Sequence, residues 1–267
     1  MKLAIAGLGA IGLAVARAVD AGRVPGIGLV AVSARNRAKA LTAMDAFKSV
    51  PPVVELAGLA EAADVVVECL PAREFAAVAS PAVERGRIFM PLSVGALIDH
   101  MDLVARARAT CARIVVPTGA LLGLDAVRAA AEGRIASSKI VTRKPPAGLA
   151  GAPLVVERGI DLEGLTEPLL LFEGSAREAI AGFPANVNVA VALSLAGVGP
   201  DATRAEIWAD PGVTRNTHTI VVKSDSSDLT MTIENIPSEE NPRTGRITAL
   251  SVLAALRRLT APLVVGS

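Results

Sequence analysis

The segment from Lys2 to Val19, KLAIAGLGAIGLAVARAV, constrains the fold of this chain more than any other stretch. It opens with the apolar run LAIA, which has the length of a buried strand, and then places glycine at 7, 9 and 12. Beyond the glycines, apolar residues recur at helical spacing. A G-x-G-x-x-G loop between a strand and a helix is typical of dinucleotide-binding sites, and a tight turn in an ordinary α/β domain is the alternative.

Each glycine of this loop has a separate physical reason. The first permits the tight turn, the second lets a pyrophosphate approach the backbone, and the third lets the helix pack closely on the strand. The N–H groups at the helix N-terminus add a partial positive charge that favours phosphate. We therefore predict cofactor contacts along the whole loop, at Gly7, Gly9, Ala10, Ile11 and Gly12.

The end of the predicted second strand, residues 26–34, bears on the choice of cofactor. NAD-selective sites place Asp or Glu there to bind the ribose 2′-hydroxyl. This chain has Ser33 and Arg35 instead, and a hydroxyl followed by a guanidinium can hold a 2′-phosphate. We therefore assign both residues to the cofactor and expect NADP to be accepted as well as NAD. The alternative is that Arg35 and Arg37 are solvated residues at the start of a helix.

Two later strands are also expected to end at the cofactor. The run at 64–70 is apolar enough for a fully buried parallel strand, and another strand is predicted at 87–92. In an open α/β sheet, ligands bind outside the carboxyl ends of the strands. The sequence therefore predicts cofactor contacts where these strands end, at Leu70, Pro71, Ser93 and Gly95.

The order of the predicted elements divides the chain. Strands and helices alternate to about residue 122, which indicates a doubly wound parallel sheet of the Rossmann type. The later segments 203–209, 217–223 and 229–236 alternate like strands of a mixed or antiparallel sheet. We therefore expect an α/β chain with a dinucleotide-binding domain at 1–122, a second, α+β domain at 123–242, and a C-terminal segment at 243–267 whose helix returns to the first domain.

Composition excludes several classes of protein. The formal net charge is +1 and no basic stripe is present, so we expect no nucleic-acid partner. No apolar run reaches the roughly 18 residues of a membrane span. Cys69 and Cys111 have neither a metal-binding spacing nor a disulfide pattern, so we expect no metal site and a cytoplasmic location.

His218 is the strongest candidate for acid–base chemistry, because the chain has only two histidines and no tyrosine. In the predicted strand it shares a face with Ile220 and Val222. A core histidine with a satisfied hydrogen bond is the alternative. His100 looks like an exposed residue near the start of a helix. If the protein needs a group that titrates near neutrality, His218 is therefore the better candidate.

Two asparagines and several cations are candidates for binding a substrate. Asn186 and Asn188 stand at the entry to an apolar helix, where they can cap it or present an amide to a carboxylate. Arg143, Lys144, Arg215 and Arg243 are cations in Pro- and Gly-rich surroundings, and a dicarboxylate would need at least one or two of them, with Arg143 and Lys144 assigned first. Each cation taken alone is more often solvated.

Several segments together resemble the L-aspartate dehydrogenase family over essentially the whole chain. The glycine loop is generic, and the later motifs are more specific. The matching segments are GLGAIG at 7–12, LSVGAL at 92–97, PTGALLGLDA at 117–126, RKPP at 143–146, FPANVNVAVALSLAG at 183–197, EIWADPGVTRNTHTI at 206–220 and ENPRTGRITALSVLAALR at 240–257.

The resemblance implies a Rossmann domain, a second domain for catalysis and dimerisation, and a homodimer. It implies interconversion of L-aspartate with oxaloacetate and ammonia through iminoaspartate, using NAD or NADP, in connection with NAD biosynthesis. The family's catalytic histidine matches His218, and its cofactor-contacting alanine and asparagine match Ala120 and Asn188.

Two other functions stay open at this point. One is a sister reductase of the dihydrodipicolinate reductase or homoserine dehydrogenase type. The first of these carries paired histidines, and His218 has no neighbouring histidine. The other is a non-catalytic NAD(P) sensor, which would usually add a regulatory or DNA-binding element, and none is visible.

Overall fold

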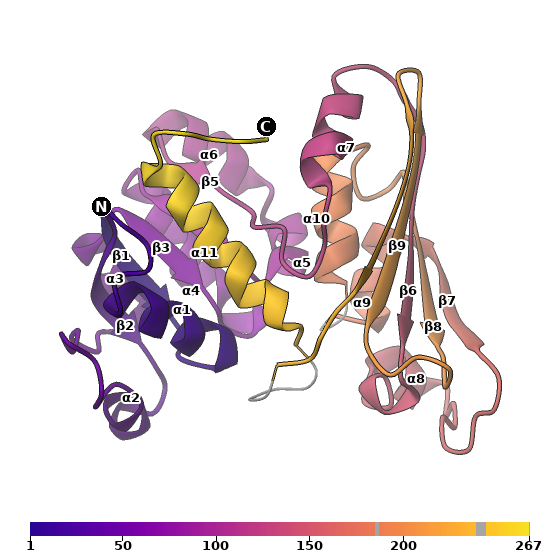
Figure 1. The fold of residues 1–267 in the computed structure, drawn as a ribbon, viewed down its shortest axis with the longest axis horizontal. Helices are drawn as coiled ribbons and strands as arrows, with labels where there is room; N and C mark the ends of the chain where they lie inside the picture. Colours follow the sequence, from indigo (N-terminus) through magenta and orange to yellow (C-terminus); the bar gives the residue numbers. More distant parts are fainter. Residues whose placement is uncertain (185–186, 239–243, 267) are drawn as a thin grey trace. The chain divides into compact units, whose positions relative to one another are not determined.

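The computed structural model describes residues 1–184, 187–238 and 244–266. The chain forms two compact units (Figure 1): Met1–Gly119 with Thr248–Val264, and Ala120–Ile247 with Val265–Ser267. Each unit is built on its own five-stranded sheet. No described helix is both long and apolar enough to span a membrane.

The sheet of the first unit has the strand order β2-β1-β3-β4-β5, and every pair of neighbours is parallel. Its strands are β1 (Lys2–Ala6), β2 (Gly28–Ser33), β3 (Val65–Glu68), β4 (Ile88–Pro91) and β5 (Arg113–Ile114). Because the order reverses between β1 and β3, the carboxyl ends of these two strands form the topological switch point at which such sheets bind ligands. The prediction of a doubly wound parallel sheet is confirmed.

The helices of this unit connect successive strands. They are α1 (Ala10–Asp20), α2 (Arg37–Ala43), α3 (Leu56–Ala62), η1 (Ala72–Glu74), α4 (Phe75–Glu84), α5 (Val94–Leu97), η2 (Ile98–His100), α6 (Asp102–Thr110) and most of α11 (Arg246–Thr260). Helix α2 begins at Arg37. The reason is an N-cap, since the Asn36 side chain accepts a hydrogen bond from the Lys39 N–H at 2.9 Å.

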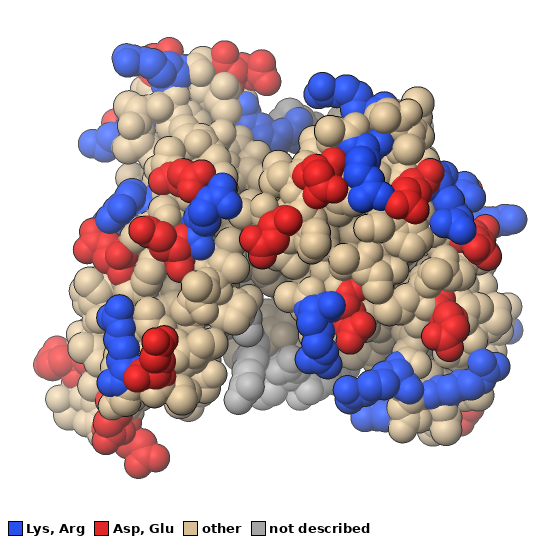
Figure 2. Space-filling view, turned by 180° about the vertical axis from the view of Figure 1, so that it is seen from behind, with Lys and Arg blue, Asp and Glu red and all other residues tan. Residues whose placement is uncertain are grey.

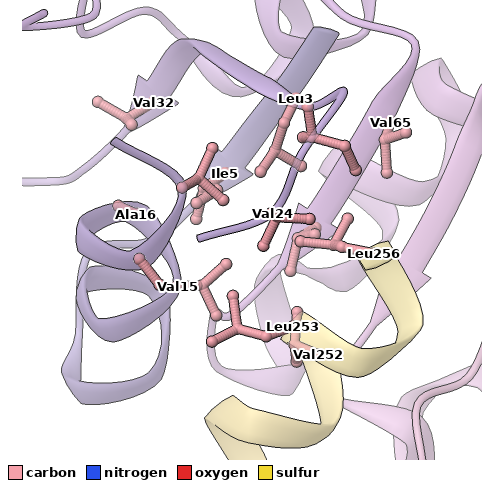
Figure 3. Close-up of a cluster of buried hydrophobic side chains, with 14 of the residues drawn as sticks. Leu3, Ile5, Val15, Ala16, Val24, Val32, Val65, Val252, Leu253 and Leu256 are labelled. Carbon is pink, nitrogen blue, oxygen red and sulfur yellow. The ribbon is translucent and has the colours of Figure 1, made fainter. Parts of the chain in front are cut away.

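The last helix belongs to the core of the first unit. Figure 3 shows Val252 and Leu256 of α11 among side chains of β1 and α1, including Leu3, Ile5 and Val15. All five side chains are fully buried. Since burial of one such side chain is worth about 1.5–3 kcal/mol, α11 is an integral part of this unit although it follows the second unit in sequence.

The sheet of the second unit is mixed, with the order β10-β9-β6-β8-β7. Only β6 and β8 are parallel to each other. The strands are β6 (Ile135–Lys144), β7 (Leu169–Ser175), β8 (Thr203–Ala209), β9 (Thr217–Ser224) and β10 (Asp228–Glu234). The helices are α7 (Leu124–Ala131), η3 (Pro146–Gly148), α8 (Pro153–Glu157), α9 (Ala176–Gly182) and α10 (Asn188–Ala196), and Figure 1 shows α7, α9 and α10 on one side of the sheet.

Burial along the central strands of this sheet alternates. On β6 the residues at 138, 140, 142 and 144 are buried, and on β9 those at 218, 220 and 222 are buried. We call the face that carries these residues the inner face. The strand register therefore places three polar positions, 142, 144 and 218, together at one end of this face.

Charge is spread over the surface in both signs. Figure 2 shows Lys and Arg side chains mixed with Asp and Glu over most of the face in view. With a net charge of +1, attraction of an anionic ligand must come from local groups, such as a helix N-terminus, rather than from a field of one sign.

Candidate functional site

The glycine loop leads from β1 into α1, and its three glycines differ in what surrounds them. Gly7 has φ +94°, and a Cβ there would lie 2.7 Å from the Cys69 carbonyl oxygen. A Cβ at Gly12 would lie 1.9 Å from the Gly7 carbonyl oxygen. A Cβ at Gly9 would meet no atom within 4 Å. The fold itself therefore requires glycine at 7 and 12, whereas the missing side chain at Gly9 leaves space outside the loop.

That space lies at the N-terminus of α1. Gly9 is the N-cap, without a capping side chain, and the first turn contains no acidic residue. Gly9 is exposed, and Ala10 and Ile11 are half-buried. The first N–H groups of the helix therefore face an open position with a partial positive charge, which fits the pyrophosphate of a dinucleotide.

The end of β2 is joined to this loop. The Gly7 N–H donates to the Ser33 carbonyl at 2.8 Å, and Ser33 is buried. Arg35 follows on the surface. The Arg37 guanidinium donates to the Val53 carbonyl at 2.9 Å, so it supports the short bridge between Val53 and β2. Because Arg37 already donates to a backbone carbonyl, Arg35 is the better candidate of the two to bind a ribose phosphate.

The ends of β3 and β4 are linked by a residue that the sequence analysis did not select, Glu68. This carboxylate is fully buried and accepts hydrogen bonds from the backbone N–H groups of Leu70, Leu92 and Ser93 at 2.6, 3.3 and 3.0 Å. Burial raises the pKa of Glu68, and the bonds from Ser93, Leu70 and Leu92 oppose that rise. The one sign of this role in the sequence was an acidic residue at the end of a run of buried valines.

The expected cofactor contacts at these strand ends are Leu70, Pro71, Ser93 and Gly95. Leu70 and Ser93 are half-buried, Pro71 is exposed at the start of η1, and Gly95 is buried within α5. Glu68 therefore brings Leu70 and Ser93 together.

Cys69 also lies at the carboxyl end of β3, directly after Glu68, and its thiol is not suited to nucleophilic chemistry. Burial, with a smaller contribution from the Glu68 charge, raises the pKa of the Cys69 thiol far above its usual range. Its backbone N–H donates to the Ala6 carbonyl at 2.8 Å. Because the thiolate is the reactive form, a thiol that stays protonated acts as a small, half-buried hydrophobe.

In the second unit, His218 lies on the inner face of β9, directly opposite Thr142 of β6. It is 3% exposed, and its Nδ1 is 3.0 Å from the Thr142 Oγ1. Burial, with a smaller contribution from the Lys144 charge, lowers the pKa of His218 to about 3. The imidazole is therefore neutral near neutral pH, which differs from the expectation of a histidine that titrates there.

Lys144 ends β6 on the same face, two residues beyond Thr142. It is buried, and its carbonyl accepts the Asp210 N–H at 2.8 Å. Burial lowers the pKa of Lys144 to about 8. Thr142, Lys144 and His218 thus form a polar cluster at one end of the inner face, and Lys144 titrates closest to neutrality among its members.

Arg143 does not join this cluster, because consecutive residues of a strand point to opposite faces. Its Nη1 is 2.8 Å from the Asp210 Oδ2. Its guanidinium carbon lies 4.8 Å from the centre of the Trp208 ring. The two neighbouring cations considered as substrate ligands are therefore separated by the sheet.

The remaining expected site residues also belong to the second unit. Asn188 is the first residue of α10 and is half-buried, whereas Asn186 lies outside the described residues. The Ala120 carbonyl accepts a hydrogen bond from the Asn235 Nδ2 at 3.1 Å. The buried Asn235 was not found from the sequence, because a single asparagine after a strand resembles a turn residue. Within the described parts of the chain, no group of three or more His, Cys, Asp and Glu side chains could hold a metal ion.

Comparison with known proteins assigns the two parts of the chain. Residues 125–259 match the family model of the aspartate dehydrogenase C-terminal region. Residues 7–117 match the NAD-binding domain of homoserine dehydrogenase. The match to homoserine dehydrogenase is thus confined to the cofactor-binding part, while the polar cluster lies in the part that resembles aspartate dehydrogenase.

Individual relatives agree with this assignment. L-aspartate dehydrogenase of Bradyrhizobium diazoefficiens is 57% identical over 100% of this chain and 94% of its own length. L-aspartate dehydrogenase 3 of Bordetella bronchiseptica is 56% identical over 100% of this chain and 98% of its own length. The crystal structure of aspartate dehydrogenase from Thermotoga maritima superposes with a TM-score of 0.74 at 25% identity, covering 100% and 99% of the two chains. The family model and the relatives cover both the unit with the G-x-G-x-x-G loop and the unit with the buried histidine, and this chain belongs to the aspartate dehydrogenase family.

Proposed function

We propose that this protein is an NAD(P)-dependent L-aspartate dehydrogenase, which deaminates L-aspartate to oxaloacetate and ammonia through iminoaspartate and also catalyses the reverse reaction. The observation that carries the proposal is the cluster of Thr142, Lys144 and His218 in the part of the chain that matches the aspartate dehydrogenase C-terminal model. The relatives at 57% and 56% identity bear the same activity in their names.

The bound nicotinamide would accept the hydride that leaves Cα of aspartate. The chain itself must handle protons, because water adds to the imine and ammonia leaves the resulting carbinolamine. A neutral imidazole can accept a proton from the attacking water and return it to the departing amine. Since Thr142 occupies Nδ1 of His218, Nε2 is the nitrogen that would exchange this proton.

Lys144 is the proposed partner of a substrate carboxylate. It lies on the inner face with His218, and at neutral pH its ammonium form predominates because its pKa is about 8. Arg143 is not included, since its guanidinium already engages Asp210 and Trp208 on the other face. Asn186 stays a proposed substrate ligand because an amide at the entry to a helix can bind a carboxylate.

The cofactor is proposed to contact the glycine loop, Ser33 and Arg35, the strand ends at Leu70 and Ser93, and the neighbouring Pro71 and Gly95. The space at Gly9 and the uncapped N-terminus of α1 support the pyrophosphate position. Ala120 and Asn188 are proposed contacts from the family match. NAD and NADP are both expected to bind, because no acid follows β2 at the ribose position.

We also propose a homodimer formed through the second unit. Support comes from the face of its sheet opposite the inner face, where Val141, Val221 and Trp208 are only half-buried. Light scattering after size exclusion should give twice the mass of one chain, and a monomer would refute the dimer.

A cytoplasmic location is proposed because both cysteines are free thiols, and cell fractionation would test it.

The activity is tested by incubating the purified protein with L-aspartate and either NAD⁺ or NADP⁺ and following the absorbance of the reduced nicotinamide. The reverse reaction uses oxaloacetate, ammonia and the reduced cofactor. Turnover with aspartate supports the proposal. Cofactor binding without turnover in either direction would instead favour a non-catalytic sensor.

A further inference from the structure

Glu68 ends β3, which lies at the centre of the first sheet. Its Oε1 accepts the Leu70 N–H, and its Oε2 accepts the N–H groups of Leu92 and Ser93. Leu70 follows β3, whereas Leu92 and Ser93 follow β4. One buried side chain therefore fixes the two segments that leave neighbouring strands at the ligand-binding edge of the sheet.

A glutamine would not replace this carboxyl group. Both oxygens of Glu68 accept backbone N–H groups, so both need a lone pair directed at a donor. The amide of glutamine has one oxygen, and its NH₂ would face a backbone N–H in either orientation. The requirement is for a carboxyl group with two accepting oxygens rather than for a polar side chain of this size.

The Ser93 hydroxyl adds a choice between two acceptors. Its Oγ is 2.6 Å from the Leu70 carbonyl oxygen and 3.1 Å from the Glu68 Oε1. A hydroxyl has one proton, so it donates to one of these oxygens at a time. When it turns to Glu68, the Leu70 carbonyl loses this donor, and a donor on a ligand can take the vacated lone pair.

The position of this group relates it to one half of the cofactor. In a doubly wound sheet the dinucleotide lies across the switch point, with its adenosine at the end of β2 and its second nucleotide on the side of β3 and β4. We propose that Glu68 is a positioning residue that holds the Ser93 hydroxyl and the Leu70 carbonyl for the nicotinamide half of the cofactor. This rests on the proposed cofactor contacts at Leu70 and Ser93.

Two ligands separate this role from general support of the fold. NADH contains the nicotinamide half, whereas adenosine diphosphate lacks both the nicotinamide and its ribose. Dissociation constants for both are measured by calorimetry on the intact protein and on the Glu68→Gln, Ser93→Ala and doubly substituted variants. Glu61→Gln is the matched control, because Glu61 is an exposed glutamate of the same unit.

Glu68→Gln and Ser93→Ala should each weaken NADH binding about tenfold, the equivalent of about one hydrogen bond, and leave the binding of adenosine diphosphate within about twofold of the parent value. The two losses should be less than additive in the double variant, because Glu68 acts in part through Ser93 and in part through Leu70. The control should bind both ligands as the parent does.

Equal weakening of both ligands, or full additivity in the double variant, would overturn the proposal. If loss of the buried carboxyl prevents folding, Ser93→Ala still decides: unchanged NADH binding, or an equal loss for both ligands, rejects the role. None of these measurements needs aspartate. A protein that lacked the proposed activity could therefore still support or refute the role of Glu68.

Discussion

His218 and Thr142 face each other across two antiparallel strands, with 3.0 Å between the imidazole Nδ1 and the threonine Oγ1. This bond fixes the plane of a buried ring and leaves Nε2 as its other polar atom. The pair is separated by 76 residues in the sequence, so the register of β6 and β9 creates it. The two residues provide separate tests of the proposed proton transfer.

The first prediction concerns catalysis by His218. His218→Ala should lower kcat by about 10²–10⁴-fold, the usual contribution of a general acid–base, while cofactor affinity persists. Thr142→Val keeps the shape of the side chain and removes the hydroxyl, so it should lower kcat by a smaller factor. Steady-state kinetics and a cofactor titration measure both effects. Near-parental turnover of His218→Ala would reject the assignment.

The second prediction concerns stability in acid. The folded-state pKa of His218 is about 3, below the ordinary value of 6.5, so between these values the unfolded state binds the extra proton. This contribution to stability is present above pH 6.5 and is lost as the pH falls toward 3, by about 1.4 kcal/mol per pH unit. The free energy of unfolding, measured with urea between pH 4 and 7, should therefore depend less steeply on pH in His218→Asn than in the parent. Parallel slopes would show that His218 is readily protonated in the folded state.

The third prediction concerns the charge of Lys144, whose pKa is about 8. If the ammonium binds a substrate carboxylate, kcat/KM for aspartate should fall as the pH rises through about 8. Lys144→Arg keeps a cation at all these pH values, so the fall in kcat/KM should shift to higher pH in this variant. Lys144→Met should raise the KM for aspartate at neutral pH and leave the KM for the cofactor unchanged. If the pH profile of Lys144→Arg matched that of the parent, the fall in kcat/KM would come from the titration of another group.

The sequence predicted features that depend on local spacing. The glycine loop was predictable because its three glycines and the flanking apolar runs are contiguous. The face of His218 followed from a period of two. Glu68 was not predictable in its role, because its donors at Leu92 and Ser93 belong to a different strand and the contact depends on the β3–β4 pairing.

The neighbouring cations show a different limit of sequence analysis. In the sequence, Arg143 and Lys144 stand directly before two prolines, so strand alternation was not applied to them. In the structure β6 continues to Lys144, and this extension places the two cations on opposite faces.

The fourth prediction separates the roles of two glycines. Gly9→Val adds a side chain where a Cβ meets no atom within 4 Å, so folding should persist while NAD and NADP both bind at least about tenfold more weakly. Gly28→Val is a matched control, because a Cβ there is equally unhindered and lies at the start of β2. Gly12→Ala should lower the melting temperature, since its Cβ would lie 1.9 Å from the Gly7 carbonyl oxygen. Unchanged cofactor titrations for Gly9→Val would refute the proposed pyrophosphate position.

The last prediction concerns the choice between the two cofactors. Ser33 is buried at the end of β2 and Arg35 is exposed just beyond it, with no carboxylate at the ribose position. An exposed guanidinium is screened by solvent, so its pairing with a 2′-phosphate should contribute at the lower end of the range for charged hydrogen bonds. We expect both cofactors to be used, with the lower KM for NADP⁺.

Arg35→Ala should therefore raise the KM for NADP⁺ by about tenfold and leave that for NAD⁺ almost unchanged. Arg37→Ala is the matched control. The Arg37 side chain donates to the Val53 carbonyl, so its removal should affect both cofactors equally or lower stability. An equal effect of Arg35→Ala on both cofactors, or strict dependence of the parent on NAD⁺, would show that Arg35 does not bind the phosphate.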